Sequence, residues 1–91
     1  MAERRVTVAS EVGLHARPAA LFVRAAGRIG VGVTLTKGDS APVDARSLLA
    51  VMALDVRHGD EVRLAAEGPG ADAALDELAA LLATDLDAAD A

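Results

Sequence analysis

Along the 91 residues of this chain, segments with a two-residue hydrophobic period alternate with segments in which apolar residues recur every three to four residues. Apolar and polar residues alternate in Arg5–Ser10, Val31–Thr36 and Glu61–Glu67, which is the two-residue period of a half-buried strand. Apolar residues recur at three- and four-residue spacings in Ala16–Arg28 and Ala71–Thr84, which predicts helices with one buried face. The succession restricts the chain to folds in which strands are interleaved with helices.

Two shorter elements complete the predicted order. The residues Lys37-Gly38-Asp39-Ser40 have the chemistry of a hairpin turn, so we expect a short return strand near Ala41–Asp44. The segment Ser47–Leu54 is largely apolar, contains no helix breaker and is bounded by turns, which predicts a two-turn helix. The predicted order is β-α-β-β-α-β-α in a single domain of residues 1–91, with a tail at 85–91 that we expect to fray.

This order predicts an α+β fold, an open-faced β-sandwich. A four-stranded antiparallel sheet would carry three helices on one face, and its other face would be left uncovered. The uncovered face is expected to carry the polar residues Thr7, Thr34, Thr36, Glu61 and Arg63.

Composition excludes several classes of protein. With 53% hydrophobic and 25% charged residues the chain is expected to fold, and without cysteine it has neither disulfides nor thiolate metal ligands. No apolar run approaches the length of about 20 residues that spans a bilayer, and the N-terminus lacks a signal-peptide core. We therefore expect a soluble cytoplasmic protein without membrane insertion.

The charge balance argues against nucleic acid as a partner. The formal net charge is −5, and Phe22 is the single aromatic residue, so general phosphate attraction and base stacking both lack support. The positive charges of Arg17, Arg24 and Arg28 are nevertheless grouped near one end of the chain, where an anion could bind locally.

The segment Gly13–Ala19 is the candidate functional site. Gly13 permits a tight turn, and His15 falls directly before the predicted first turn of a helix, where unpaired N–H groups and the helix dipole attract anions. Arg17 adds a charged fork that suits phosphate, and Pro18 is tolerated in the first turn. A neutral imidazole in this position is a nucleophile that could carry a phosphoryl group. The residues alone leave open that His15 only caps the helix or lies on the surface.

The heptad Gly13-Leu14-His15-Ala16-Arg17-Pro18-Ala19 closely resembles the active-site signature of the HPr family, the histidine-containing phosphocarriers of the bacterial sugar phosphotransferase system. The resemblance extends over essentially the whole chain and implies an HPr-like fold. It implies that Nδ1 of His15 accepts phosphate from phosphorylated enzyme I and passes it to an enzyme IIA domain. Arg17 and the backbone N–H groups of Ala16 and Arg17 would steady the phosphoryl group.

The sequence contains no motif for binding a metal ion or a nucleotide near the candidate site. No acidic cluster that could hold a metal ion lies near His15 in the sequence, and no phosphate-binding loop of the nucleotide-binding type is present. We therefore expect neither a metal nor a cofactor. The chain is expected to be a carrier that forms a phosphohistidine intermediate, and not an enzyme.

A second segment, Arg46–Leu54, resembles the regulatory-serine region of the family. Ser47 heads the predicted short helix and is expected to be its N-cap. In part of the family the matching serine is phosphorylated by a dedicated kinase, so a serine kinase and phosphatase are possible partners. Ala50 and Arg46 depart from the fully regulated pattern, where glycine and lysine are usual, and this favours the capping role.

The family comparison also implies a surface through which partners dock. It would form an exposed, largely apolar patch around the histidine, made by Ala16, Arg17, Ala20, Leu48, Leu49 and Met52. From helical spacing alone, core packing is the safer assignment for Leu48 or Val51.

Other interpretations remain. A specialised HPr paralogue in a nitrogen-regulatory or dihydroxyacetone-kinase phosphorelay would use the same histidine chemistry. A purely regulatory binding module is disfavoured because the family's relatives of that kind lack the histidine. His58, in the turn before Gly59, is expected to be a solvated loop residue and not a metal ligand. We expect a monomer.

Overall fold

The computed structural model describes residues 2–84. Its seven elements follow the predicted order: β1 (Ala2–Thr7), α1 (Ala16–Ile29), β2 (Val33–Lys37), β3 (Val43–Asp44), α2 (Leu48–Ala53), β4 (Glu61–Ala66) and α3 (Ala71–Leu82). The predicted frayed tail at 85–91 lies outside the described residues. Among residues 2–84, no helix is both long enough and apolar enough to cross a membrane.

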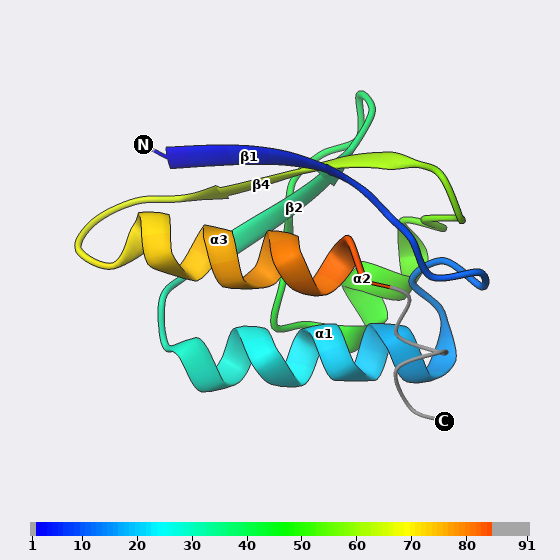
Figure 1. The fold of residues 1–91 in the computed structure, drawn as a ribbon, viewed down its shortest axis with the longest axis horizontal. Helices are drawn as coiled ribbons and strands as arrows, with labels where there is room; N and C mark the ends of the chain where they lie inside the picture. The colour runs from blue at the N-terminus through cyan, green and yellow to red at the C-terminus, as the bar shows by residue number, and fades with distance from the viewer. Residues whose placement is uncertain (1, 85–91) are drawn as a thin grey trace.

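The four strands form one antiparallel sheet in the order β1-β4-β2-β3 (Figure 1). The late strand β4 lies between β1 and β2, and pairs with β1 from Ala2↔Ala66 to Thr7↔Glu61. Pairing between β2 and β4 runs from Val33↔Ala66 to Lys37↔Val62. The predicted four-stranded antiparallel sheet is confirmed.

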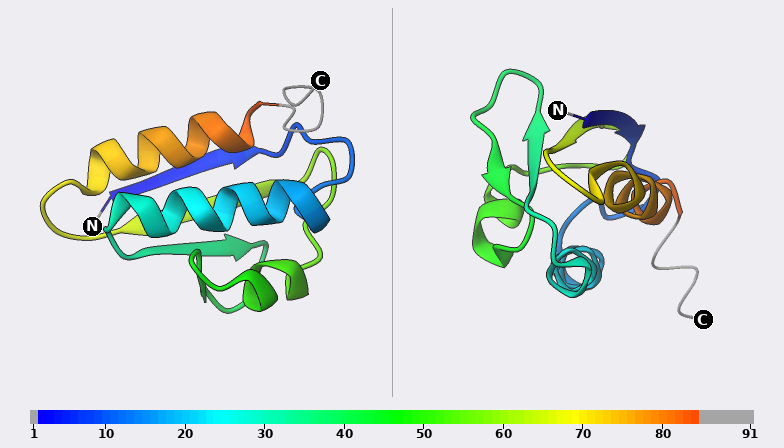
Figure 2. Two further views of the ribbon diagram at one scale, coloured as in Figure 1. Left: turned by 90° about the horizontal axis from the view of Figure 1, so that it is seen from below. Right: turned by 90° about the vertical axis from the view of Figure 1, so that its left-hand side faces the viewer.

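All three helices lie on the same side of the sheet, so the predicted open-faced sandwich is confirmed (Figure 2). Helix α3 packs on β1 and β4, α1 lies beside α3, and α2 packs against both α1 and β3. The N-terminus of α1 and the C-terminal end of α2 therefore lie close to the loop between α2 and β4.

The core fills the space between the sheet and the helices. Alternate residues of the strands point into it, including Leu35 of β2 and Leu64 of β4, both fully buried. Phe22 of α1 is also fully buried and is the largest side chain in the core. The predicted stripe on α3 is confirmed, because Leu75, Leu78 and Leu82 are all buried.

Two details differ from the prediction. β1 begins at Ala2 and not at Arg5, because β4 offers backbone partners as far as Ala66. The segment Val8–Ser10 leaves the sheet. Val8 N–H instead donates to Asp60 O, in the loop before β4, at 2.9 Å, and Ala9 N–H donates to Leu82 O, at the end of α3, at 3.0 Å.

The uncovered face of the sheet also differs at one residue. Thr7, Thr34 and Glu61 are exposed, but Thr36 is only 5% exposed. Thr36 lies directly opposite Arg63 in the pairing of β2 with β4, so the two side chains are neighbours on this face of the sheet. Burial at this position follows from strand pairing and is not visible in the local alternation.

Candidate functional site

His15 lies directly before the first helical residue of α1, as its N-cap. Its backbone is extended, with φ −124° and ψ 157°, and its side chain is 38% exposed. The imidazole makes no capping hydrogen bond to the helix, and the first turn contains no acidic residue. The ring is therefore accessible beside the positive end of the helix dipole, and no acidic side chain of the first turn offsets that positive charge.

The loop before His15 is held against the loop between α2 and β4. The buried Leu14 anchors it, and Leu14 N–H donates to the carbonyl of Val56 at 2.9 Å. Gly13 has a φ of +69°, and a Cβ built there would overlap the carbonyl oxygen of Val56 and lie 2.6 Å from Cα of Arg57. Only glycine satisfies both the backbone conformation and this close contact.

A second pair of hydrogen bonds holds the same two loops together at Val8. Gly59 N–H donates to the carbonyl of Val8 at 2.9 Å, reciprocating the bond from Val8 to Asp60. The turn that presents Gly59 is closed by the carboxylate of Asp60, which accepts from Arg57 N–H at 2.8 Å. Lys37 adds an ion pair to Asp60 at 3.2 Å. The site therefore rests on a hydrogen-bonded loop pair.

Acid is expected to weaken this loop pair. The amide of Arg57 and then the ammonium of Lys37 lower the pKa of Asp60 below its ordinary value of 3.8. A carboxyl whose pKa is lower in the folded state stabilises the fold above its ordinary pKa, and this stability is lost as the pH falls through the folded pKa. We expect Asp60→Asn to flatten the decline of the unfolding free energy below about pH 4, where the unfolded carboxyl titrates. Urea unfolding at pH 6 and pH 3 measures this, with Asp39→Asn as the charge-matched control; an undiminished decline in Asp60→Asn would contradict it.

Asp55 is a residue of the site that sequence reasoning missed. Its Oδ1 lies 3.2 Å from Nε2 of His15, and its Oδ2 accepts from the guanidinium of Arg57 at 2.9 Å. The guanidinium of Arg57 is the main cause that lowers the pKa of Asp55. Lys37 and His15 lower this pKa to a smaller extent. Forty residues separate Asp55 from His15, so no local pattern could reveal the contact.

The first turn of α1 places Ala16 and Arg17 next to the histidine. Both are exposed, and Ala16 adopts a φ of +48° in the left-handed region. Arg24 follows on the same helix, two turns along. Arg28 lies at the opposite end of α1 and pairs with Glu77 at 3.4 Å. The grouping of three arginines expected from the sequence is therefore spread along the helix, and only Arg17 lies beside His15.

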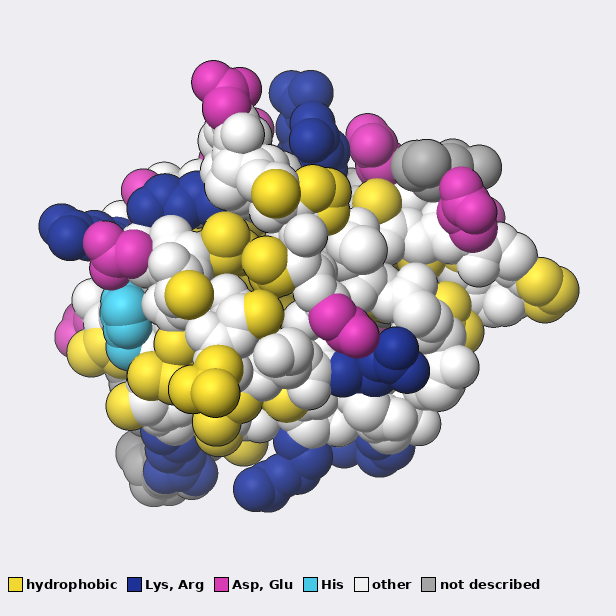
Figure 3. Space-filling model, turned by 180° about the vertical axis from the view of Figure 1, so that it is seen from behind, with side chains coloured by type: hydrophobic (Ala, Val, Ile, Leu, Met, Phe, Trp, Pro, Cys, Tyr) yellow, Lys and Arg dark blue, Asp and Glu magenta, His cyan; other side chains and the backbone are white. Residues whose placement is uncertain are grey.

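Apolar side chains gather where α1 meets α2. Leu48 is 40% exposed and Leu49 82% exposed, Met52 is partly buried, and Val51 is fully buried. Helical spacing places Ala16 and Ala20 on one face of α1. We call the set Ala16, Arg17, Ala20, Leu48, Leu49 and Met52 the α1–α2 patch. Figure 3 shows hydrophobic side chains gathered beside a histidine, with charged side chains around them.

Ser47 is the N-cap of α2. Its hydroxyl accepts a hydrogen bond from Ala50 N–H at 3.4 Å. The adjacent Arg46 pairs with Asp44 at 3.2 Å, so its charge is engaged next to the cap. The predicted capping role is confirmed.

His58 is exposed in its loop, with Nδ1 at 3.2 Å from the carbonyl oxygen of Ser10. The ring therefore helps to join the same two loops as Gly59 and Val8. Within residues 2–84, no three histidine, cysteine or acidic side chains are grouped as metal ligands would be.

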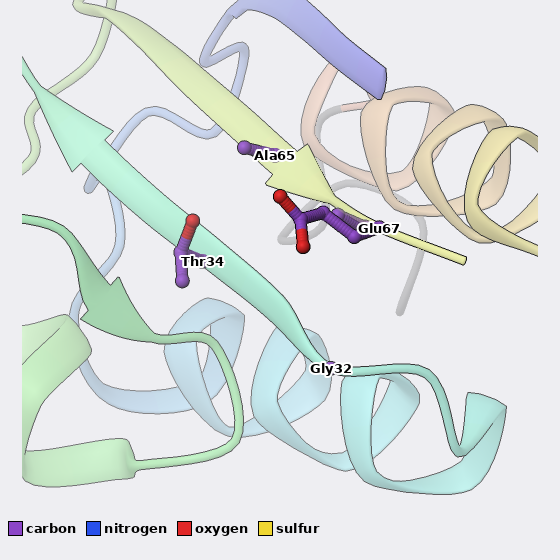
Figure 4. Close-up of a pocket in the computed structure, with 5 residues that line it drawn as sticks. Gly32, Thr34, Ala65 and Glu67 are labelled. Carbon is purple, nitrogen blue, oxygen red and sulfur yellow. The ribbon is translucent and has the colours of Figure 1, made fainter. Parts of the chain in front are cut away.

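A hollow of about 350 Å³ lies at the other end of the sheet from His15, bordered by Gly32, Thr34, Ala65, Ala66 and Glu67 (Figure 4). Its side chains are small or acidic, and Glu67 would repel an anion. This hollow is therefore unsuited to binding an anion.

Comparison with known proteins agrees with this geometry. The family described as "PTS HPr component phosphorylation site" matches residues 2–84. The chain is 54% identical to "Phosphocarrier protein HPr" of Streptomyces coelicolor, over 96% of this chain and 94% of that protein. It is 51% identical to "Phosphocarrier protein HPr" of Haloferax volcanii, over 90% and 93%.

The fold is similar to solved structures of the same kind. A crystal structure of a phosphocarrier protein HPr from Bacillus anthracis aligns with a TM-score of 0.84 at 38% identity, covering 89% of this chain and 95% of that one. Sequence and fold thus agree over nearly the full length. The chain belongs to the HPr family, the phosphocarrier proteins of the phosphotransferase system.

Proposed function

We propose that Nδ1 of His15 accepts a phosphoryl group from phosphorylated enzyme I and passes it to a histidine of an enzyme IIA domain during sugar uptake. The observation that carries this proposal is the accessible imidazole at the N-terminus of α1, uncommitted to capping the helix. The positive end of the helix dipole favours a dianionic group there. Family membership supports the same role.

The transfer conserves atoms and charge. The lone pair of Nδ1 attacks the phosphorus of the donor phosphohistidine, the new N–P bond forms, and the N–P bond of the donor breaks. The reverse step on the acceptor returns His15 to its free state. The protein is a carrier in this scheme, because it begins and ends each cycle unphosphorylated without converting a substrate of its own.

The test is incubation with phosphoenolpyruvate and a general enzyme I. We expect one phosphate per chain, labile in acid and stable in base, as for phosphohistidine. An acid-stable phosphate or none would contradict the proposal. Parallel reactions with nitrogen-regulatory and dihydroxyacetone-kinase-type enzyme I proteins separate a general carrier from a specialised one; acceptance only from one of these would assign the chain to that relay.

Arg17 is proposed to steady the phosphoryl group with its guanidinium, together with the N–H groups of Ala16 and Arg17. We expect Arg17→Ala to slow transfer from enzyme I by about tenfold, the effect of losing one hydrogen bond to a charged group. The fold should be unchanged, because the side chain is exposed. The matched control is Arg24→Ala, which removes the same charge about 10 Å farther along the helix. Equal rates in the two variants would remove Arg17 from the mechanism.

The α1–α2 patch is proposed as the surface on which enzyme I and the enzyme IIA domains dock. Its exposed apolar side chains lie where α1 packs against α2, and Arg17, two residues after His15, suits acidic partner surfaces. Adaptable side chains such as that of Met52 fit successive, transient partners. Docking of this kind is expected to weaken with salt, since charges at the rim of an interface are screened.

Regulatory phosphorylation of Ser47 by a serine kinase stays a prediction beside the cap. Aspartate caps helices as well as serine does, so Ser47→Asp adds a negative charge without removing the cap. If charge at Ser47 opposes docking of acidic partners, transfer from enzyme I should slow in Ser47→Asp and stay normal in Ser47→Asn. Normal transfer in both variants would count against an electrostatic switch.

A further inference from the structure

We propose that Asp55 is a positioning residue for His15, whose carboxylate holds the proton of the ring on Nε2 and so leaves Nδ1 as the nucleophilic nitrogen. The inference deepens the proposed function and rests on it for its biological meaning. Its chemical content, the choice between two ring nitrogens, can be measured without any partner protein.

The geometry assigns the proton to Nε2 of His15 because the carboxylate of Asp55 can only accept a hydrogen bond. Oδ1 of Asp55 lies 3.2 Å from Nε2 of His15. An ionised carboxylate has no proton to donate, so the hydrogen bond requires a proton on Nε2. A neutral imidazole carries one proton, and Nδ1 is then left with its lone pair.

Asp55 is itself held in place from several sides. Arg57 binds the second carboxylate oxygen through two nitrogens, at 2.9 and 3.3 Å. Lys37 donates to the backbone carbonyl of Asp55 at 2.7 Å, and Asp55 N–H donates to Met52 O at 3.1 Å. The two backbone bonds tie Asp55 to β2 and α2, and Arg57 of the following loop binds its carboxylate.

The backbone at Asp55 is unusual. Its φ of +53° lies in the left-handed region, which is unfavourable for a residue with a Cβ, although aspartate tolerates it better than most. Glycine would adopt this conformation at lower cost. Strained residues concentrate at functional sites. The two non-glycine residues with a positive φ among residues 2–84 are Ala16, next to the histidine, and Asp55, whose carboxylate reaches it.

The carboxylate also suits the transfer step. When Nδ1 attacks phosphorus, the ring gains positive charge while its proton stays on Nε2. The ionised Asp55 stabilises that charge from the far side of the ring, as the aspartate of a serine-protease triad does for its histidine. The step needs no other proton acceptor.

His58 provides an internal reference of opposite kind. Its Nδ1 lies 3.2 Å from the carbonyl oxygen of Ser10. A carbonyl oxygen only accepts, so the proton of His58 lies on Nδ1 and its lone pair on Nε2. The two histidines of the chain should therefore react through different nitrogens.

Phosphoramidate tests this directly, since it phosphorylates imidazole without an enzyme. The ring nitrogen with the lone pair attacks phosphorus, the P–N bond of the protonated reagent breaks, and ammonia leaves. NMR of phosphorus and of ¹⁵N-labelled histidine then distinguishes phosphate on Nδ1 from phosphate on Nε2. In the wild-type protein we expect His15 to be labelled on Nδ1 and His58 on Nε2.

The decisive variant is Asp55→Gly, which removes the carboxylate and relaxes the backbone, so its folding should not be impaired. We expect the ratio of Nδ1 to Nε2 phosphate on His15 to fall by about two- to fivefold, the effect of losing an exposed ion pair. The products on His58 should not change. Asp55→Asn, which keeps the shape without the charge, should also lower the ratio.

The outcomes separate this inference from the proposed function. An unchanged ratio on His15 in Asp55→Gly would overturn the role of Asp55, even if enzyme I phosphorylates the protein normally. A ratio that depends on Asp55 would uphold that role, even if enzyme I leaves the wild-type protein unlabelled and the proposed function fails. A merely structural role for Asp55 would alter stability and would leave the choice of nitrogen unaffected.

Discussion

His15→Ala is expected to abolish phosphate acceptance from enzyme I completely. The variant lacks the nucleophilic nitrogen, and neither Arg17 nor the helix end can replace it, because both only donate hydrogen bonds to a phosphoryl group. The loss should therefore be of the whole signal and not a change of rate. Radiolabelled phosphate bound per chain, measured after incubation with phosphoenolpyruvate and enzyme I, gives the result.

The matched control is His58→Ala, which removes the second histidine of the chain and leaves the helix end intact. It should accept close to one phosphate per chain. The unfolding free energy of His15→Ala should lie within about 1 kcal/mol of wild type, because the side chain is partly exposed and its contact to Asp55 is a surface pair. Residual acid-labile phosphate in a folded His15→Ala protein would show that His15 is not the acceptor.

Gly13→Ala is expected to cause the largest loss of stability among single substitutions in the site. The added methyl group would overlap the backbone of Val56 and Arg57, and the φ of +69° disfavours alanine independently of space. The left-handed conformation costs about 1–2 kcal/mol and overpacking about 1–3 kcal/mol, so a loss of roughly 2–5 kcal/mol is expected. Urea unfolding measures it. Because the clash separates the two loops that hold His15, phosphate acceptance should also slow.

Gly38→Ala separates the two contributions. Gly38 has a similar φ of +56° in the turn before β3, but nothing lies within 4 Å of a Cβ placed there. This control should lose only the conformational cost, about 1–2 kcal/mol, and should accept phosphate normally. If both variants lose equal stability, the close contact at Gly13 contributes nothing.

Most of the fold was predictable because each element carries its own local signal. The stripe of leucines on α3 and the alternation in β4 reflect burial on one face, and burial repeats with the period of the element. Gly30 ends α1 in the left-handed conformation that a glycine there permits. The start of β1 was less predictable, since a strand extends as far as its partner offers hydrogen bonds, and that partner is β4, near the other end of the chain.

The candidate site divides in the same way. The histidine and the arginine two residues later were identifiable because a helix start is a local event, marked by the turn before it and the proline within it. Arg24 and Arg28 lie away from His15 simply because the helix is long. Counting charges along the chain nevertheless placed these arginines in one group with Arg17. Burial of Thr36 required the neighbouring strand.

By itself, the amino-acid sequence determined the succession of strands and helices, the N-cap position of His15 and the family. Each of these depends on patterns among residues that are close together along the chain. The tertiary structure alone decided that Asp55 faces His15 and that the backbone of Val56 lies against Gly13. Both contacts join segments about forty residues apart, and such contacts form only when the sheet and helices pack and bring the two loops together.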